Sequence, residues 1–128
     1  MSNGLFLSLS YADAPAAMEF LSKAFGFVEK ARYSADDDPS KIVHAQMDWP
    51  NGGGLMFGSA GADSTLVGTA RCYCVTQTDE DVDRIYQQAL VAGATSVRSP
   101  ENPAYGGRVC AVADPEGNQF SFGSFPGD

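Results

Sequence analysis

The chain contains one segment twice, and this repeat constrains the fold more than any other feature. Trp49–Ser59 aligns with Asp114–Ser124 without a gap, and the Pro, Gly, Phe, Gly and Ser residues shared by the two copies coincide at a constant offset of 65 residues. A repeat at this spacing indicates two copies of one supersecondary unit, neither large enough to bury its own core. The groove between the two copies is therefore where we first expect a functional site.

The composition is that of a globular protein. The chain has 128 residues and 44% hydrophobic content, which argues against the disordered and fibrous classes. No apolar run approaches the ~20 residues that a membrane helix needs. The first residues lack the basic and then apolar layout of a signal peptide. We therefore expect a cytoplasmic protein that does not interact with membranes.

The charge balance is strongly acidic. Sixteen acidic and eight basic residues give a formal net charge of −8. This argues against nucleic acid and anionic membrane surfaces as partners, because phosphate binding needs clustered Lys and Arg. It is compatible with a cationic ligand. The alternative is an ordinary solvated surface, since much of the negative charge lies in residues 36–38 and 79–81.

The three cysteines are expected to be reduced and structural. Cys72 and Cys74 lie two residues apart in an alternating segment, so their side chains share one face of a strand, with the sulfurs poorly placed to bond each other. An odd count without a secretion signal indicates free thiols. A metal at this Cys-x-Cys pair would need further soft ligands nearby, and none is visible. We expect Cys72, Cys74 and Cys110 to act as small buried hydrophobes.

Hydrophobic periodicity predicts one helix and four strands in the first half. Asp13 is the expected N-cap of the helix, and Gly26 is expected to end it. The acidic stretch 36–40 is expected to end the second strand. Strands are expected over residues 5–10, 27–33, 42–49 and 55–58.

The second half repeats this order. Thr78 and Asp81 are expected to form a capping box at the start of a helix that Gly93 ends. Residues 99–107, rich in Pro and Gly, are expected to form a loop. Strands are expected over residues 71–76, 95–98, 108–113 and 119–125.

The two halves predict one domain built from two modules. Module one covers residues 4–59, a linker covers 60–69, and module two covers 70–125 of a single domain, 1–128. Each module has the order βαβββ. This order predicts an α+β fold class with helices on one face of each sheet.

Four segments resemble the vicinal oxygen chelate superfamily, also called the glyoxalase/bleomycin resistance protein/dioxygenase family. The strongest is Asp114–Phe120, which is similar to the family's Asp-Pro-x-Gly-Asn-x-aromatic hairpin, and Tyr105–Arg108 resembles the approach to that hairpin. Tyr11–Phe27 is similar to the first helix and its Phe-Gly-Phe exit. His44–Met47 resembles a His-Ala-Glu-Leu strand found in one branch. The similarity covers nearly the whole chain.

The resemblance implies that the two modules curve into an open, cup-shaped barrel and that the protein is a dimer, sometimes with modules shared between chains. It does not select a function. The superfamily includes isomerases, lyases, ring-cleaving dioxygenases, antibiotic-modifying transferases and drug-sequestering proteins without catalysis. Its enzymes bind a divalent metal at the floor of the cup, through His, Glu and Gln side chains from the first and fourth strands of each module.

The residues at these ligand positions do not suit a metal. The family's Glu lies seven residues after the Asp of the hairpin, which is Ser121 here, and the repeat offset gives Met56 in module one. The first strands offer Phe6 or Ser8, and Arg71 or Tyr73. None of these is His, Glu, Asp or Gln, which are the donors for divalent metals here. We therefore expect no metal and no other cofactor.

Strand alternation predicts which side chains face the cup instead. Val43, Ala45 and Met47 are expected on the buried side of the third strand, so that His44 and Gln46 face the other way. The expected ligand-binding residues are Phe6, Ser8, His44, Gln46, Met56, Arg71, Tyr73, Tyr105 and Ser121. Such a lining suits an organic ligand that a few directed hydrogen bonds hold in place.

Two functional hypotheses follow from this lining. The first is a metal-independent small-molecule binding protein of the bleomycin-resistance type, a homodimer that sequesters a cationic, aromatic ligand. The second is an enzyme, a glyoxalase-related lyase, isomerase or dioxygenase in which His44, the only histidine, is the general base or binds a metal with Gln46. A structural or ligand-contacting His44 is the alternative, because no carboxylate partner is assignable. A regulatory or scaffold role without a ligand is a third hypothesis.

Overall fold

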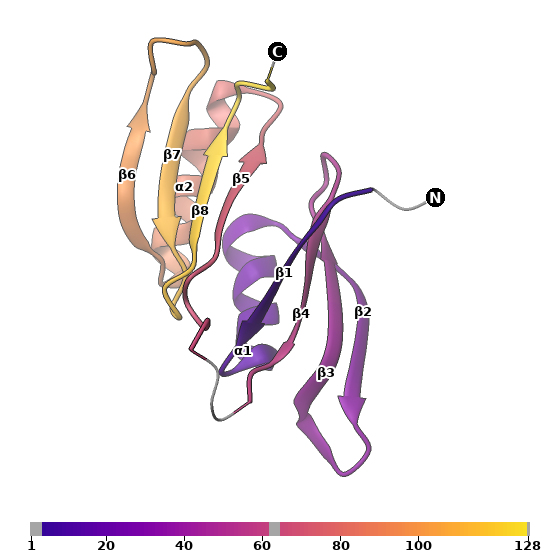
Figure 1. Ribbon diagram of the computed structural model, residues 1–128. Coiled ribbons are helices and arrows are strands. Elements are labelled where there is room, and N and C mark those ends of the chain that lie inside the picture. The colour runs from indigo at the N-terminus through magenta and orange to yellow at the C-terminus, as the bar shows by residue number, and fades with distance from the viewer. Residues whose placement is uncertain (1–3, 62–64, 128) are drawn as a thin grey trace.

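The chain folds into two modules, each with one four-stranded sheet (Figure 1). The computed structural model describes residues 4–61 and 65–127, so residues 62–64 of the expected linker lie outside it. Module one contains β1 (Phe6–Tyr11), α1 (Ala14–Phe20), the π-helical turn η1 (Leu21–Phe25), β2 (Val28–Ala35), β3 (Asp38–Asp48) and β4 (Gly54–Ser59). Module two contains β5 (Arg71–Val75), α2 (Asp79–Ala92), β6 (Thr95–Glu101), β7 (Val109–Ala113) and β8 (Gln119–Gly123). The predicted α+β class with two βαβββ modules is confirmed.

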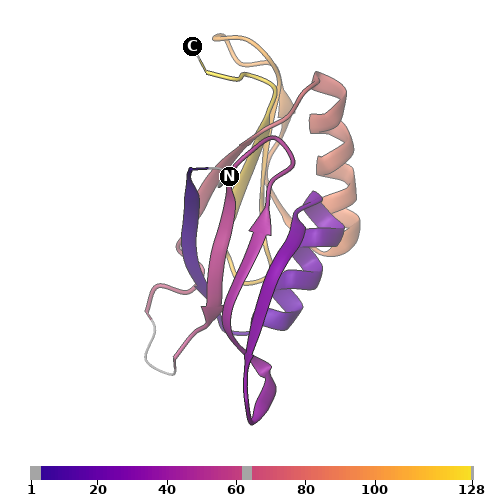
Figure 2. The ribbon, with the colours of Figure 1, turned by 90° about the vertical axis from the view of Figure 1, so that its right-hand side faces the viewer.

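The two sheets have the same strand order and remain open. The orders are β1-β4-β3-β2 and β5-β8-β7-β6, so β1 and β5 are edge strands. These two edges lie next to each other between the modules (Figure 1). Figure 2 shows the helices of both modules on one side of the sheets, leaving the other sheet faces uncovered. This open arrangement is consistent with the expected cup. No helix in the described part of the chain has the length and apolar character needed to cross a membrane.

The repeat offset recurs in the pairing of the strands. β1 pairs in parallel with β4, and β5 pairs in parallel with β8. The pair Ser8–Met56 of module one corresponds to the pair Tyr73–Ser121 of module two, each residue being displaced by 65. Five of the six pairs between β1 and β4 have such a counterpart. The repeated segment is therefore a structural repeat, and its register can be transferred from one module to the other.

The hairpin of β2 and β3 is longer than expected. The stretch 36–40 was expected to be a connection between the second and third strands. Only two residues connect them, because β2 ends at Ala35 and β3 begins at Asp38. The expectation that Val43 is buried is wrong. The pairing shifts between Tyr33–His44 and Ser34–Ile42, which is a bulge. As a result Ile42 is buried and Val43 is 62% exposed.

Other boundaries differ by smaller amounts. The helix of module one widens into η1 before Gly26, which has a φ of 91° and ends it as predicted. The capping box of Thr78 and Asp81 is present at the start of α2. β6 extends to Glu101, three residues beyond the expected end.

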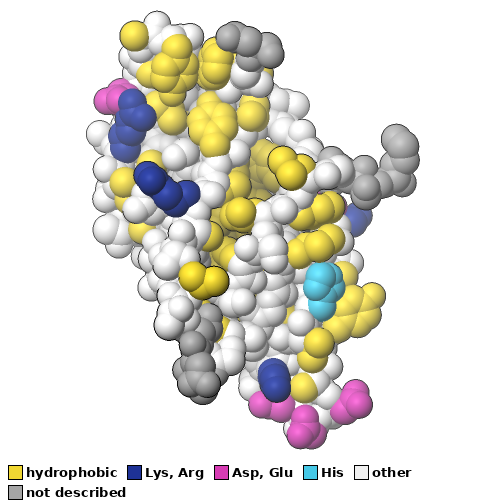
Figure 3. All heavy atoms as spheres, in the orientation of Figure 1, with side chains coloured by type: hydrophobic (Ala, Val, Ile, Leu, Met, Phe, Trp, Pro, Cys, Tyr) yellow, Lys and Arg dark blue, Asp and Glu magenta, His cyan; other side chains and the backbone are white. Residues whose placement is uncertain are grey.

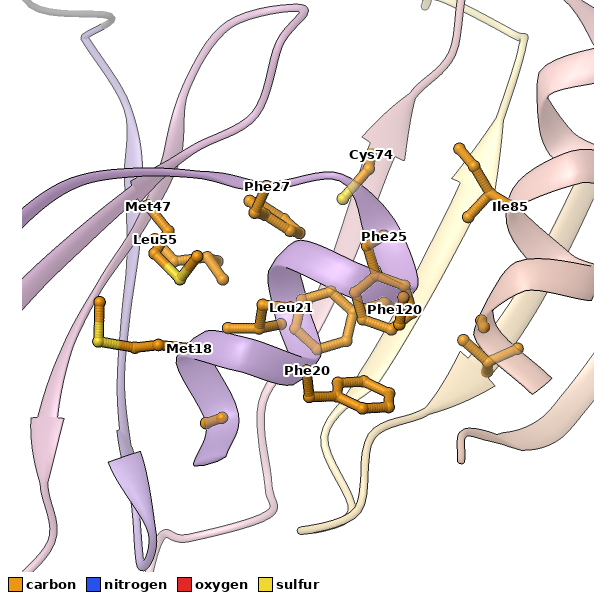
Figure 4. Close-up of a cluster of buried hydrophobic side chains, with 14 of the residues drawn as sticks. Met18, Phe20, Leu21, Phe25, Phe27, Met47, Leu55, Cys74, Ile85 and Phe120 are labelled. Carbon is orange, nitrogen blue, oxygen red and sulfur yellow. The ribbon is translucent and has the colours of Figure 1, made fainter. Parts of the chain in front are cut away.

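An aromatic cluster joins the two modules beneath the sheets (Figure 4). The ring of Phe25 lies 4.9 Å from the rings of both Phe120 and Phe122, as measured between centroids. The ring of Trp49 lies 5.1 Å from that of Phe27 and 5.6 Å from that of Phe122. Each such ring removes roughly 150–250 Å² of surface from water. The core is therefore shared between the modules rather than divided between them.

The hairpin between β7 and β8 makes hydrogen bonds with module one, and we call this set of contacts a clasp. The hydroxyl of Tyr11 donates to Oδ2 of Asp114 over 2.7 Å, and both side chains are buried. The Asp114 carboxylate also accepts hydrogen bonds from the backbone N–H groups of Glu116 and Asn118. The carboxylate of Glu116 accepts the backbone N–H groups of Ala12 and Asp13, at 2.6 and 2.9 Å. These contacts hold the end of β1 and the start of α1 against module two.

The equivalent hairpin of module one makes hydrogen bonds with module two, which form a second clasp. Trp49 and Asn51 lie 65 residues before Asp114 and Glu116. The indole Nε1 of Trp49 donates to the carbonyl of Val75 over 2.8 Å, and the amide of Asn51 donates to the same oxygen over 2.7 Å. Each module therefore reaches the end of the first strand of the other. The intermodule contact has approximate two-fold symmetry, although the side chains that make it differ.

We predict that Tyr11→Phe destabilises the protein through this clasp. The variant removes one donor from the buried Asp114 carboxylate, and a loss of this kind costs about 1–3 kcal/mol. Urea unfolding should show a lower midpoint with an unchanged slope. Tyr105→Phe is the matched control, because Tyr105 is exposed and surface changes stay within about 0.5 kcal/mol. Equal midpoints for the two variants would contradict the assigned role of Tyr11.

Candidate functional site

The strand register determines which residues occupy the ligand positions that the resemblance implies. On the uncovered faces of the sheets, Ser8 of β1 lies opposite Met56 of β4, and Tyr73 of β5 lies opposite Ser121 of β8. Ser8 and Tyr73 are exposed, whereas Met56 and Ser121 are half-buried. Sequence spacing alone left Phe6 or Ser8, and Arg71 or Tyr73, as candidates. The register selects Ser8 and Tyr73.

These four side chains do not fit a divalent metal. Two are aliphatic hydroxyls, one is a phenol and one is a thioether, and none carries the negative charge that a carboxylate ligand supplies. The phenol of Tyr73 donates to the backbone carbonyl of Phe125 over 2.9 Å. Burial of the Tyr73 ring raises the pKa of its phenol, so the phenolate that could bind a metal is disfavoured. Residues 4–61 and 65–127 contain no cluster of three or more His, Cys, Asp and Glu side chains able to hold a metal ion.

A polar row follows β3 on the same sheet face. His44, Gln46 and Asp48 are all half-buried. The amide of Gln46 donates to Oδ1 of Asp48 over 2.8 Å, which fixes the orientation of the Gln46 side chain. The ring of His44 lies 6.2 Å from that of Tyr33. No hydrogen bond or ion pair joins the His44 side chain to another residue in the described part of the chain.

The same face of module two is apolar. The residues displaced by 65 from His44 and Gln46 are Val109 and Ala111, and both are buried. At these two positions module one is therefore polar and module two is apolar.

A hollow lies at the seam between the edge strands β1 and β5. It has a volume of 540 Å³, and Figure 3 shows hydrophobic side chains gathered in the depression between the modules. We call it the seam hollow. Its lining consists of Leu5, Phe6, Leu7, Phe27, Trp49, Asn51, Gly52, Gly53, Gly54, Leu55, Cys72, Tyr73, Cys74 and Val75. The walls are mostly aromatic, aliphatic and thiol groups, as expected for a site that takes an organic molecule.

The seam hollow includes two of the nine residues expected to bind a ligand. Phe6 and Tyr73 line it. Ser8, His44, Gln46, Met56, Arg71, Tyr105 and Ser121 lie outside its lining. Direct contact of all nine with a ligand stays a prediction. The structure places seven of them on the open sheet faces or at their ends rather than in this hollow.

Tyr73 and Tyr105 belong to a second, smaller group of aromatic side chains at the end of β8. The ring of Tyr105 lies 5.1 Å from that of Phe125, to whose carbonyl Tyr73 is bonded. The Tyr73 side chain covers Gly123, where a Cβ atom would overlap with the phenol group. These side chains border a hollow of 490 Å³. Gly123 therefore allows the Tyr73 side chain to approach β8 closely.

From the sequence, Trp49 could either stack on a flat ligand ring or pack in the core, and Phe27 was not among the residues expected to bind a ligand. Both line the seam hollow as well as the core. The signal that could have identified Trp49 is the repeat itself, because the offset equates Trp49 with Asp114 of the family hairpin. The contact between Trp49 and Val75 has no sequence signal, because it joins residues 26 positions apart in different modules.

Two of the three free thiols also line the seam hollow. The sulfurs of Cys72 and Cys74 are 3.8 Å apart and form a hydrogen bond. This bond lowers the pKa of the half-buried Cys72 thiol. The same bond and burial raise the pKa of Cys74. Cys110 lies elsewhere in the core, and burial raises its pKa to about 11. The expectation of free thiols is confirmed. Cys72 and Cys74 line the seam hollow in addition to packing against the core.

Comparison with known proteins identifies the family. A sequence profile of the Glyoxalase/Bleomycin resistance protein/Dioxygenase superfamily matches residues 6–122. The chain therefore belongs to this superfamily, as the motifs indicated. It is 37% identical over 120 residues to Uncharacterized protein Mb0911c of Mycobacterium bovis, an alignment that covers 87% of this chain and 76% of that protein.

Solved structures show the same fold. TioX from Micromonospora sp. ML1 superposes with a TM-score of 0.69 and 25% identity, covering 93% of this chain and 95% of that one. A family enzyme from Burkholderia phytofirmans PsJN superposes with a TM-score of 0.70 and 21% identity, covering 96% and 98%. Membership of the superfamily leaves catalysis and binding both open.

We predict that Cys72 is the most reactive thiol of the native protein. The thiolate is the nucleophile, and Cys72 combines a lowered pKa with access from the seam hollow. Iodoacetamide at neutral pH should label Cys72 at least about tenfold faster than Cys74 or Cys110, as measured by peptide mapping.

The hydrogen bond from Cys74 gives this prediction a second test. Cys74→Ala removes the donor, so the pKa of Cys72 should rise and its labelling profile should move to higher pH. Cys74→Ser keeps a donor and should restore most of the effect. An unchanged profile in Cys74→Ala would show that the neighbouring thiol does not activate Cys72.

Proposed function

We propose that this protein is a metal-independent small-molecule binding protein that acts by sequestration, as bleomycin-resistance proteins of the superfamily do. The observation that carries the proposal is the pairing of Ser8 with Met56 and of Tyr73 with Ser121 at the implied ligand positions. Groups with this chemistry do not hold a divalent cation. The protein therefore lacks the Lewis acid that family enzymes use to polarise a substrate.

The chemistry of the seam hollow supports an organic ligand with aromatic rings. Phe27, Trp49 and Tyr73 line it, and aromatic side chains attract both flat rings and cations. The net charge of −8 adds a long-range attraction for a cation. The ligand class is a cationic, aromatic natural product, of which the bleomycin-type antibiotics are the first to test.

The setting of this activity is also part of the proposal. The protein acts in the cytoplasm as a homodimer. Three free cysteines support a reducing compartment. Exposed apolar side chains on the β2–β3 hairpin, Tyr33 and Val43, each 62% exposed, support a second copy of the chain as partner.

A second candidate function is catalysis at the polar row of β3. It is supported by the position of His44 beside Gln46, whose side chain Asp48 orients. A neutral imidazole on an open sheet face can accept a proton from a bound substrate. A glyoxalase-related lyase, isomerase or dioxygenase reaction of this kind would depend on His44.

Titration with bleomycin-type compounds tests sequestration. Because Trp49 is the only tryptophan and lines the seam hollow, a ligand there should change its fluorescence, with one site per chain and micromolar or tighter affinity. Tyr73→Ala should weaken binding about 3- to 30-fold, since one aromatic contact contributes about 0.5–2 kcal/mol. Val91→Ala, on the exposed side of α2, is the control. The absence of binding at micromolar concentrations would reject this ligand class.

The catalytic candidate predicts a different result. Protein purified without chelators is analysed for bound metal and assayed for turnover of glyoxalase-type and aromatic diol substrates. If catalysis occurs, His44→Ala should reduce kcat by about 10²-fold or more, whereas Tyr73→Ala should mainly raise KM. Stoichiometric metal at the cup would overturn the sequestration proposal.

A further inference from the structure

Cys72 and Cys74 are arranged as a two-sulfur chelate. They occupy alternate positions of β5, opposite Phe120 and Phe122 of β8, so both side chains leave the same face of the strand. Their sulfurs lie 3.8 Å apart. An atom bonded to two sulfurs at about 2.3 Å each can bridge sulfurs that are up to about 4.6 Å apart. One bridging atom therefore fits between these thiols with little rearrangement.

A direct disulfide fits this pair poorly. Alternate residues of a strand are about 6.6 Å apart, and their Cβ atoms point in the same direction. A disulfide needs Cβ atoms about 3.5–4.5 Å apart. The backbone of β5 is held by its ladder with β8, so closing a disulfide would distort paired strands. The pair is thus better suited to a bridging atom than to oxidation.

The surroundings of the thiols select the kind of bridging atom. No cluster of three or more His, Cys, Asp and Glu side chains exists among the described residues, whereas zinc and similar ions take three or four protein ligands. A trivalent arsenic atom with one organic substituent needs only two sulfurs. The product is neutral, so placing it among Leu7, Phe27 and Trp49 avoids the cost of burying a charge.

The seam hollow gives both access and room for the substituent. Cys72 is half-buried, and Cys74, which is 4% exposed, points from β5 toward Phe27 (Figure 4). Both sulfurs line the same 540 Å³ space as the aromatic side chains. An aromatic substituent on the arsenic can therefore contact Phe27 and Trp49 while the arsenic binds the thiols.

We propose that Cys72 and Cys74 form a dithiol site for trivalent monosubstituted arsenicals, with the organic substituent in the seam hollow. The inference rests on the proposed function in one respect, because it assigns a ligand class to the same hollow. Its chemistry is a substitution without a change of oxidation state. Two As–O bonds of R–As(OH)2 break, two As–S bonds form, and the two thiol protons leave with the hydroxides as water. Cys72, the more acidic thiol, attacks first, and Cys74 then closes the ring.

Phenylarsine oxide tests the site in the intact protein. Native mass spectrometry should show one phenylarsenic group per chain, and thiol titration should show two of the three cysteines protected. Cys72→Ser and Cys74→Ser should each weaken binding by about 10²-fold or more, because the second bond forms intramolecularly at high effective concentration. A dithiol such as 2,3-dimercaptopropanol should release the arsenical at far lower concentration than 2-mercaptoethanol.

Cys110→Ser is the matched control. It also removes one thiol, but Cys110 lies in the core with its sulfur 3.9 Å from the carbonyl of Val82, so phenylarsine oxide binding should remain unchanged. Thermal unfolding of all three variants identifies any loss of folding. Cys72→Ala, at a half-buried position, should lose phenylarsine oxide binding as Cys72→Ser does. Binding that depends on Cys110, or that protects fewer than two thiols, would overturn the proposal.

The same measurements separate this inference from the proposed function. Arsenical binding without any binding of cationic natural products would support the dithiol site and reject sequestration of that ligand class. Binding of a natural product with no effect of phenylarsine oxide on the thiols would reject the dithiol site alone.

Discussion

The buried hydrogen bond between Tyr11 and Asp114 is the contact on which the arrangement of the modules depends. It joins side chains 103 positions apart at 2.7 Å, and both side chains are buried. Burial and the neighbouring carboxylate raise the pKa of Tyr11 further, so the phenol remains a donor at any physiological pH. Together with the contacts of Glu116 to Ala12 and Asp13, it determines where β1 ends relative to module two.

This arrangement explains why the molecule has a hollow at its centre. The clasps hold the ends of β1 and β5 but do not pair the two strands, and the sheets remain separate. The space between their edges is bordered by Trp49 and Asn51 on one side and by β5 on the other. The hairpins that hold the modules together therefore also shape the seam hollow, where we propose that a ligand binds. Substitutions in the clasp should affect binding and stability together.

Much of the fold could be predicted because the repeat makes each position of one module equivalent to a position of the other. The offset of 65 gave the equivalence of Met56 with Ser121, and the observed register extends it to Ser8 and Tyr73. Val43 could not be placed, because a bulge depends on how β2 and β3 pair rather than on alternation in one strand. The contacts of the clasps could not be predicted either, since they join distant residues.

The site was harder to predict than the fold for a related reason. Alternation identifies the two faces of a strand, but the seam hollow opens at the edges of β1 and β5 and is lined by side chains from both faces. Two of the residues expected to bind a ligand, Phe6 and Tyr73, line this hollow, whereas Cys72 and Cys74, which also line it, were expected only as core residues. Their shared position on the strand was visible from spacing, but the hollow beside them was not.

The reciprocal clasps have a consequence for how copies of this chain associate. Every contact that one module makes with the other could be made in the same way by a module of a second molecule, since nothing in these contacts requires covalent continuity. Exchange of modules between two molecules would therefore preserve the shared core, both hairpin contacts and the hollow. The balance between closed monomers and interlocked pairs would then depend on the connecting segment and on protein concentration, rather than on any new interface.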